Sequence, residues 1–527
     1  MRKKICAWLL ALVFACLGFS GCKKTDGPGD TGGVVPDMDL SQKLTISWMI
    51  PTQQGLSLTE TPMFQAIQEK LNIEIELTEM PVSQFEEKKK LNITAKEIPD
   101  IMSWTKGAEA NEYGPLGAFL ELSQYFEYTP NIKEKIESAI ADSENVRYAV
   151  YNAENKIYMM PHYLVNPIPI FDFSYVKSAF DEVGVTSLNT WDQVYEGLKK
   201  IKEANPSEYP LAFRNHAGMQ VPLRLFVESF TGARATTLDY TGYDYDTNQF
   251  QFALDVPGYK EAVAFFAKLY TEGLIHPDYT IMDEQMLKTR ISRGKIVMIA
   301  DFIGGWSGVP SIMKDIDNNL LPLPTPQASG QDVVIGREIP VFDSSVGTII
   351  NQNVAKDPVK LGRCLQFLDY IYSQEFYDLQ WHHPDVTVKN DDGTYTYKPE
   401  VYDLEGDYNR MKDTYFPWAM TANFQDAMEE RPTIGSPYYE YRETYLRGEE
   451  SKDKYKPFPI VPLSLEEQQA VNQAVASITD RFNASISQFA EGKRSMDEWE
   501  EFSNSLKQAG GNELISIYNE ALKRLNK

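Results

Sequence analysis

The chain has 527 residues, of which 43% are hydrophobic and 24% charged, as in ordinary globular proteins. This composition excludes a collagen-like protein, a long coiled coil and a multi-pass membrane protein, and the length suffices for roughly two to four domains. The 75 acidic residues outnumber the 51 lysines and arginines, and the resulting formal charge of −24 makes nucleic acid and anionic lipid surfaces unsuitable partners.

The N-terminus has the pattern of a bacterial secretion signal. Basic residues 2–4 precede an apolar run over residues 5–19, which is shorter than the roughly 20 residues that a membrane-spanning helix needs. Small residues then lead to Cys22, and this segment resembles the lipobox of bacterial lipoproteins, although Phe19 stands where that motif usually has leucine. The resemblance implies that residues 1–21 are a removable signal peptide and that Cys22 carries a lipid. The alternative is a plain secretory signal with an incidental cysteine.

A flexible tether is expected between the lipid and the body of the protein. Residues 22–42 are rich in glycine, proline and aspartate and form no apolar face. Of the four cysteines, only Cys364 remains outside the signal and the lipobox, so we expect no intramolecular disulfide. These features predict an extracytoplasmic protein, attached through its lipid alone to the bacterial cell membrane, or to the periplasmic side in a two-membrane cell.

The body alternates expected strands and helices. Alternating residues predict strands over 44–50 and 73–77, with a helix from Pro62 to Leu71 between them. A lysine-rich helix over 84–96 and a short strand over 99–102 follow. This βαβαβ order predicts a wound, mostly parallel sheet.

The middle and the C-terminal part repeat this alternation. Helices are expected over 191–204 and over 259–272. Thr280 with Asp283 resembles a capping box before a further helix that runs to about Arg293, and a buried strand over 296–300 follows. Another helix should begin at the Asp357–Pro358 cap, and the chain from Leu465 onward is nearly all helical.

Several segments, in the same order over residues 44–527, resemble the extracellular solute-binding proteins of ABC importers, in particular the family-1, carbohydrate, LplA-like type. The matching segments are AKEIPDIM from Ala95, KIYMMP from Lys156, LYTEGLIHPDYTIMD from Leu269, GKIVMIAD from Gly294 and the terminal helix pair from Phe489 to Tyr518.

This resemblance implies an α/β, two-lobed, type II periplasmic-binding-protein-like fold with extra C-terminal helices. The first lobe is expected to comprise residues 43–153 and 321–352, and the second residues 154–320 and 353–527. The chain would cross between the lobes near residues 153, 320 and 352. The implied function is capture of a carbohydrate between the lobes by a monomer, without cofactor, and delivery to an ABC permease in the membrane.

Three departures from the family pattern bear on ligands. The place of a calcium loop in many relatives is taken here by residues 202–213, which have few carboxylates, so we expect no metal. Residues 381–387, WHHPDVT, replace a family loop that often lines the ligand site. The Asn390–Gly393 segment lacks spaced calcium ligands and is expected to be a hairpin turn.

Sugars have apolar faces that stack on aromatic rings and hydroxyls that bond to charged groups. Residues that follow expected strands or lie in aromatic connectors are therefore candidate ligand contacts, because loops at the carboxyl ends of strands line the crevice in α/β folds. Core packing is the alternative for the aromatic residues, and a capping role for Asp301. Arg214 and the histidines hint at an anionic group on the ligand. The candidates are Trp48, Trp104, His162 or Tyr163, Arg214, His216, Asp301, Trp306, Trp381, His382, Phe416 and Trp418.

Catalysis is not expected, because the sequence contains no Gly-x-Ser-x-Gly, no His-Glu-x-x-His and no phosphate-binding glycine loop. Two alternative functions remain open. One is a surface glycan-binding or sensor-partner lipoprotein that is not coupled to import, and the other is a glycoside hydrolase.

Overall fold

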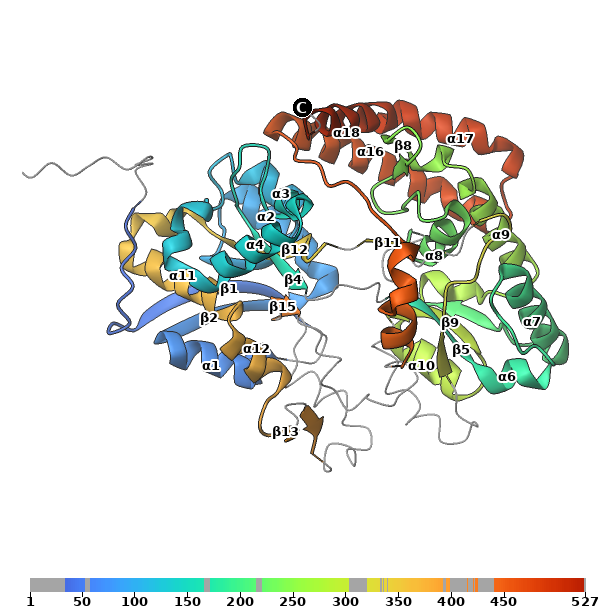
Figure 1. Ribbon diagram of the computed structural model, residues 1–527, viewed down its shortest axis with the longest axis horizontal. Coiled ribbons are helices and arrows are strands. Elements are labelled where there is room, and N and C mark those ends of the chain that lie inside the picture. Colours follow the sequence, from blue (N-terminus) through green and yellow to red (C-terminus); the bar gives the residue numbers. More distant parts are fainter. Residues whose placement is uncertain are drawn as a thin grey trace, which may run out of the picture.

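The computed structural model describes residues 34–525 apart from 53–56, 165–170, 215–219, 303–319, 332–333, 335, 339, 392–394, 399–414, 416–419, 421 and 425–439. Two lobes lie side by side, each with a central sheet covered by helices (Figure 1). The expected α/β, two-lobed fold class is therefore confirmed.

The first lobe contains a six-stranded sheet in the order β15-β4-β12-β3-β1-β2. Strand β1 pairs in parallel with β2 and β3, and β4 pairs in parallel with β15. Strand β12 is antiparallel to both of its neighbours, β3 and β4, so the other five strands run in one direction. The strands are β1 Leu44–Thr52, β2 Ile73–Pro81, β3 Ile101–Thr105, β4 Met160–Leu164, β12 Phe342–Ile350 and β15 Asn423–Phe424.

Helices from two distant parts of the sequence cover this sheet. Their caps explain where they begin: Asp357 accepts hydrogen bonds from the N–H groups of Val359 and Lys360 ahead of a proline at the first helical position, as expected. The elements are α1 Pro62–Leu71, α2 Val82–Ala95, α3 Gly107–Tyr113, α4 Pro130–Asp142, α5 Arg147–Val150, α11 Pro358–Ile371, α12 Gln374–Trp381, η1 Leu58–Glu60, η2 Ser123–Tyr128, η3 Glu144–Val146 and η8 Gln352–Lys356.

The second lobe contains a four-stranded sheet in the order β10-β5-β9-β6. Strand β5 is antiparallel to both neighbours, whereas β6 and β9 are parallel. Both central sheets are thus mixed, and the expectation of mostly parallel sheets is wrong for the second lobe. The strands are β5 Phe171–Val176, β6 Leu211–Phe213, β9 Met298–Phe302 and β10 Leu320–Leu323, with the two-stranded pairs β7 Thr241–Asp244 with β8 Gln249–Phe252 and β11 Gly336–Arg337 with β16 Tyr455–Lys456.

Aromatic packing holds the helices of the second lobe onto its sheet. Trp191 stacks on Phe226 with ring centroids 4.6 Å apart, and its indole N–H donates to Ser229 Oγ at 3.0 Å. Much of the aromatic content of the chain lies in this core. The elements are α6 Lys177–Glu182, α7 Trp191–Ala204, α8 Gln220–Thr231, α9 Tyr259–Thr271, α10 Glu284–Ser292, α16 Leu465–Ala490, α17 Trp499–Leu506, α18 Asn512–Leu525, η4 Ala253–Asp255, η5 Pro277–Thr280, η10 Tyr441–Leu446, η11 Glu449–Lys454, η12 Met496–Glu498 and η13 Lys507–Gly511.

The division of the elements between the lobes differs from the expected boundaries. Strand β4 was expected in the second lobe but lies in the sheet of the first, and most of β10 was expected in the first lobe but lies in the sheet of the second. Helix α11, which was expected in the second lobe, buries Leu361, Leu365 and Leu368 in the core of the first lobe because its apolar face packs on α1 and β1. The hairpin expected after Asn390 is confirmed, since β13 Thr387–Lys389 pairs antiparallel with β14 Tyr395–Tyr397.

The end of the expected tether is docked rather than free. The N–H of Asp37 donates to the Pro358 carbonyl at 2.9 Å, and the guanidinium of fully buried Arg363 donates to the carbonyls of Asp39 at 2.9 Å and Gln42 at 3.2 Å. We call residues 37–42 the N-terminal strap. A Cβ on Gly362 would lie 1.9 Å from the Asp37 carbonyl oxygen, so the strap approaches α11 as closely as glycine permits.

A direct contact joins the lobes away from the central sheets. The side-chain amide of Asn472, on α16, donates to Glu112 Oε2 on α3 at 2.6 Å. Figure 1 shows α16 and α18 reaching over the second lobe toward α3. Within the described residues, none of the helices combines the length and the apolar character that a membrane crossing requires.

Candidate functional site

The strand directions bring several predicted residues to one edge of each sheet. In the first lobe, Trp104 lies near the carboxyl end of β3, and His162 and Tyr163 lie near the carboxyl end of the parallel strand β4. In the second lobe, Arg214 directly follows β6 and Asp301 lies near the end of the parallel strand β9. Loops at such carboxyl edges form the ligand crevice in open α/β sheets.

Chain connectivity keeps these two edges near each other. Strand β4 ends at Leu164 on the first edge, and β5 begins at Phe171 on the second edge. Six residues, and so seven Cα–Cα steps, separate these positions, which means that their Cα atoms lie at most about 25 Å apart. Figure 1 agrees, with β4 and β15 on the side of the first lobe nearest the second.

An aromatic corner forms the edge of the first lobe. The ring of His162 meets the half-buried indole of Trp104 edge-on, with centroids 6.2 Å apart and planes at 79°. Next along β4, the half-buried ring of Tyr163 packs against Phe342 at 5.2 Å and lies beneath the ammonium group of Lys135 at 4.5 Å. Half-buried rings of this kind combine a fixed orientation with some remaining exposed surface.

His162 is held neutral at this corner. Burial lowers the pKa of His162 from 6.5 to about 4, against an opposing influence from the carboxylate of Asp343. Asp343 is the residue opposite His162 in the β4–β12 pairing. At neutral pH the imidazole of His162 is therefore uncharged, and the cation at this corner is the ammonium group of Lys135 above Tyr163.

A two-point ion pair forms the edge of the second lobe. Nε of Arg214 lies 2.7 Å from Asp301 Oδ2, and Nη2 lies 2.8 Å from Oδ1. The Asp301 side chain is fully buried, whereas 18% of the Arg214 side chain is exposed. Because both carboxylate oxygens bond to Arg214, Asp301 is arranged to orient the guanidinium rather than to accept hydroxyl groups directly.

Asp172 is a second buried carboxyl group at the same edge. It lies opposite Asp301 in the β5–β9 pairing and accepts hydrogen bonds from Thr325 Oγ1 at 2.9 Å and from the hydroxyl of Tyr441. Burial raises the pKa of Asp172 to about 7, although these bonds and the Phe173 N–H act to lower it. The group thus titrates near neutrality.

The remaining predicted residues lie elsewhere or outside the described residues. Trp48 is 2% exposed and packs edge-on against Phe367 at 5.0 Å, with its indole N–H bonded to Ser103, so it is a core residue in this conformation. The core alternative for Trp48 is therefore the one that the structure favours. Trp381 is also buried, at 9% exposure, at the end of α12. The positions outside the described residues are Cys22, His216, Trp306, Phe416 and Trp418.

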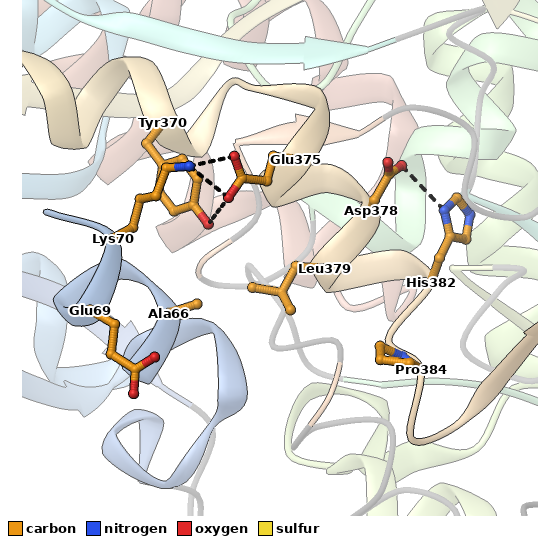
Figure 2. A pocket seen from close by; sticks show the side chains of 9 residues that line it. All are labelled: Ala66, Glu69, Lys70, Tyr370, Glu375, Asp378, Leu379, His382 and Pro384. Carbon is orange, nitrogen blue, oxygen red and sulfur yellow. Dashed lines mark hydrogen bonds and ion pairs between the residues drawn. The ribbon is translucent and has the colours of Figure 1, made fainter.

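His382 belongs to a different feature, a shallow pocket of about 600 Å³ on the first lobe between α1, α11 and α12 (Figure 2). Lys70 bonds to Glu375 at 2.7 Å, and His382 Nδ1 lies 3.4 Å from Asp378. The ring of His382 stacks on Tyr395 at 3.8 Å. Lys70 and Glu375 thus form an ion pair in the pocket, whereas burial lowers the pKa of His382 and favours its neutral form. Among the described residues no three histidine, cysteine or carboxylate side chains gather into a metal site.

Two buried charged residues, Asp172 and Lys89, were missed from the sequence. Asp172 is a charged residue in a strand of mainly apolar residues. Because burial of a carboxylate is costly, its presence there is a sequence signal for a functional or paired group. Lys89 shares the four-residue spacing of Phe85 and Ile93, which are both buried, so its position on the inward face of α2 was also detectable.

Comparison with known proteins agrees with this architecture. A model of the family described as bacterial extracellular solute-binding protein matches residues 62–385, more than half of the chain. The lipoprotein LipO of Bacillus subtilis (strain 168) is 25% identical over 382 residues, which cover 71% of this chain and 71% of LipO.

Solved structures of sugar-binding proteins share the fold. The alginate-binding protein AlgQ2 superposes with a TM-score of 0.74 at 16% identity, covering 92% of this chain and 99% of AlgQ2. The HMO binding, ABC-transporter-associated protein of Bifidobacterium longum infantis has a TM-score of 0.71 at 16% identity, covering 91% of this chain and 98% of its own. The substrate-binding protein FusA of S. pneumoniae, in complex with kestose, has a TM-score of 0.71 at 15% identity. The superposition covers 92% of this chain and 100% of FusA.

The matched family and these structural neighbours are binding proteins rather than enzymes, and the family match covers the whole second sheet and strands β2, β3, β4 and β12 of the first. The chain belongs to the bacterial extracellular solute-binding protein family.

Proposed function

We propose that this protein captures a carbohydrate, most simply an oligosaccharide, between the two sheet edges and delivers it to an ABC permease. The observation that carries the proposal is the fold likeness over about nine tenths of the chain to proteins described as binding alginate, HMO and kestose. Family membership supports a binding function, and the fold places an aromatic corner and an oriented arginine at the two edges.

The two edges suit different parts of a sugar. The indole of Trp104 and the ring of Tyr163 would stack on the apolar faces of the pyranose or furanose rings, each contributing about 0.5–1.5 kcal/mol beyond the area that it buries. The Arg214 guanidinium, oriented by Asp301, would donate hydrogen bonds to hydroxyl or carboxylate oxygens. Several such bonds and two or three stacked rings suffice for roughly micromolar affinity, about −8 kcal/mol.

Other predicted contacts remain part of the proposal. His216 follows Arg214 closely in sequence, and Trp306, Phe416 and Trp418 lie in aromatic connectors that would complete the wall of the site. Trp381 and His382 would contribute from the end of α12 if closure of the lobes exposes them. Trp48 is left out, because it packs in the core.

The partners follow from the family. Closure of one lobe onto the other would exclude water from the sugar and create the surface that the transmembrane permease subunits recognise. A lipid on Cys22 would hold the monomer at the extracytoplasmic face of the membrane, and the relative LipO is itself named a lipoprotein.

A thermal-shift screen of the purified chain from residue 34 onward, against mono- and oligosaccharides including acidic ones, tests the ligand class. We expect at least one oligosaccharide to raise the melting temperature with a concentration dependence that gives a micromolar Kd. A response to amino acids or peptides but to no glycan would overturn the proposal. Analysis of the recovered glycan separates binding from the hydrolase alternative, because catalytic cleavage would contradict a pure binder.

Uptake of the labelled glycan by cells with and without the gene tests the import step. We expect uptake to fall strongly when the gene is deleted and to recover with the wild-type gene. Unchanged uptake, together with altered transcription in response to the glycan, would favour the sensor-partner alternative instead.

A further inference from the structure

Trp104 has an unusual backbone conformation at the carboxyl end of β3. Its φ is +60°, in the left-handed region that residues with side chains rarely adopt. The residue lies where the pairing of β3 with β12 is irregular: Thr105 pairs with Gly347 and Met102 with Ile349, so β3 has one more residue than β12 between these two pairs, as in a β-bulge. A conformation of this kind persists where surrounding contacts impose it, and such positions are concentrated at functional sites.

Lys89 is the side chain that contacts the backbone of this residue. It lies on α2 and is 0% exposed, and its ammonium group donates to the Trp104 carbonyl oxygen at 3.1 Å. The same Nζ lies 3.0 Å from Glu86 Oε1 and 2.8 Å from Glu109 Oε2. Three acceptors thus match the three donors of the ammonium group.

The two carboxylates link Lys89 to the helices that precede and follow Trp104 in the sequence. Glu86 belongs to α2, which precedes β3, and Glu109 belongs to α3, which follows it. Glu109 Oε2 also accepts the N–H of Lys106, two residues after Trp104, at 3.0 Å. The irregular end of β3 around Trp104, which we call the Trp104 turn, is therefore held at the Trp104 carbonyl group and at the start of α3.

We propose that Lys89 is a positioning residue, which holds the Trp104 turn in its left-handed conformation and so sets the direction of the indole toward the ligand. The inference deepens the proposed function, because it assumes that Trp104 stacks on the bound sugar. The Trp104 carbonyl supplies the third acceptor that the buried ammonium group needs, and the same bond fixes the peptide group of the one left-handed residue of the strand. Removal of the amine frees the Trp104 carbonyl and with it the backbone torsions on which the indole direction depends.

The test uses Lys89→Met, which keeps the aliphatic length and removes the donors. Lys106→Met is the matched control, because Lys106 Nζ bonds to the same Glu86 at 3.1 Å but is half exposed, whereas Lys89 is buried. Both variants are labelled with 5-fluorotryptophan, and the Trp104 resonance is assigned by Trp104→Phe. This readout needs no ligand, so it decides the positioning claim even if the proposed carbohydrate function fails.

We expect the fluorine resonance of Trp104 to shift or broaden in Lys89→Met while the other tryptophan resonances stay in place, and all resonances to stay in place in Lys106→Met. With a glycan identified, the Kd of Lys89→Met should rise at least about fivefold, and Lys89→Met combined with Trp104→Ala should bind no more weakly than Trp104→Ala alone. An unmoved Trp104 resonance in folded Lys89→Met overturns the proposal, as do additive losses in the double variant.

Lys89→Met leaves two carboxylates without their buried partner and risks misfolding. Glu109→Gln is therefore the second variant, since it retains a hydrogen-bond acceptor while it weakens the hold on Lys89. We expect a smaller shift of the same Trp104 resonance and a Kd increase of about twofold. The same resonance position as in the wild type would contradict the role assigned to Lys89.

Discussion

Asp172 and Asp301 lie directly opposite each other on β5 and β9, yet they occupy different electrostatic environments. Asp301 is bonded at both oxygens to Arg214, whereas Asp172 has hydroxyl and backbone partners, and burial raises its pKa to about 7. The edge of the second sheet therefore holds one paired carboxylate and one that gains a proton near neutral pH.

The first prediction concerns the pH dependence of the unfolding free energy, to which Asp172 and His162 contribute with opposite signs. A carboxyl whose native pKa is raised stabilises the fold below its unfolded pKa of about 4, and that stabilisation is lost as the pH rises toward 7. A histidine whose pKa is lowered to about 4 stabilises above its unfolded value of 6.5 and loses that contribution as the pH falls. The two contributions oppose each other between pH 4 and 7, each worth about 1.4 kcal/mol per pKa unit.

Guanidinium unfolding of Asp172→Asn and His162→Gln at pH 4.5 and pH 7 checks these signs. Relative to the wild type, the unfolding free energy of Asp172→Asn should rise by a few kcal/mol between the two pH values, and that of His162→Gln should fall. Parallel profiles for the wild type and both variants would show that neither group titrates in this window.

The second prediction concerns the Arg214–Asp301 pair. Asp301→Asn removes the charge that faces a largely buried guanidinium, so we expect the unfolding free energy to fall by about 2–4 kcal/mol. The matched control is Glu449→Gln, whose partner Lys452 and own side chain are both well exposed, and which should cost less than about 1 kcal/mol. Equal small losses in the two variants, measured by denaturant unfolding, would mean that the Asp301 pair is not buried in solution.

The third prediction separates a core tryptophan from a ligand-binding one. Trp48→Ala leaves a cavity against Phe367 and should lower the unfolding free energy by about 3–5 kcal/mol with little effect on the Kd of the folded protein. Trp104→Ala should instead raise the Kd by about tenfold, because a stacked ring contributes about 0.5–1.5 kcal/mol beyond its buried area. Calorimetric titration of both variants would refute this division if Trp48→Ala lost affinity and Trp104→Ala did not.

The fourth prediction concerns the N-terminal strap. Deletion of residues up to Gln42 exposes α11 and leaves the buried Arg363 without the carbonyls of Asp39 and Gln42, so the melting temperature should fall by several degrees. A chain that begins at residue 34 is the control and should melt like the full mature chain. Gly362→Ala should have an effect similar to the deletion, because its methyl group would collide with the Asp37 carbonyl. Unchanged melting of both variants would show that the strap contributes nothing.

Sequence patterns predicted the periodic elements of this fold well. The cap at Asp357, the helix from Trp191 and the strand over 296–300 appear close to the expected positions, because local capping and apolar spacing determine them. The assignment of α11 to the wrong lobe has a physical cause. Its apolar face is equally compatible with either core, and the long-range packing on α1 and β1 decides the choice.

The candidate site was predictable in part for a similar reason. Strand ends are visible in sequence, so the positions of Trp104, Arg214 and Asp301 at sheet edges could be predicted from strand direction. Their contact with a ligand stays a prediction. The bidentate bond that turns Asp301 toward Arg214, and the contact of Tyr441 with Asp172 across 269 positions of sequence, depend on tertiary geometry that no local pattern encodes.

Small-angle X-ray scattering of the chain from residue 34 onward, with and without a saturating oligosaccharide from the screen, tests most directly whether two lobes close around an intact sugar. The account predicts a smaller radius of gyration and a shorter maximum dimension with the glycan, reversed when the glycan is dialysed away unaltered. Saturated binding with superimposable scattering curves would contradict capture between moving lobes.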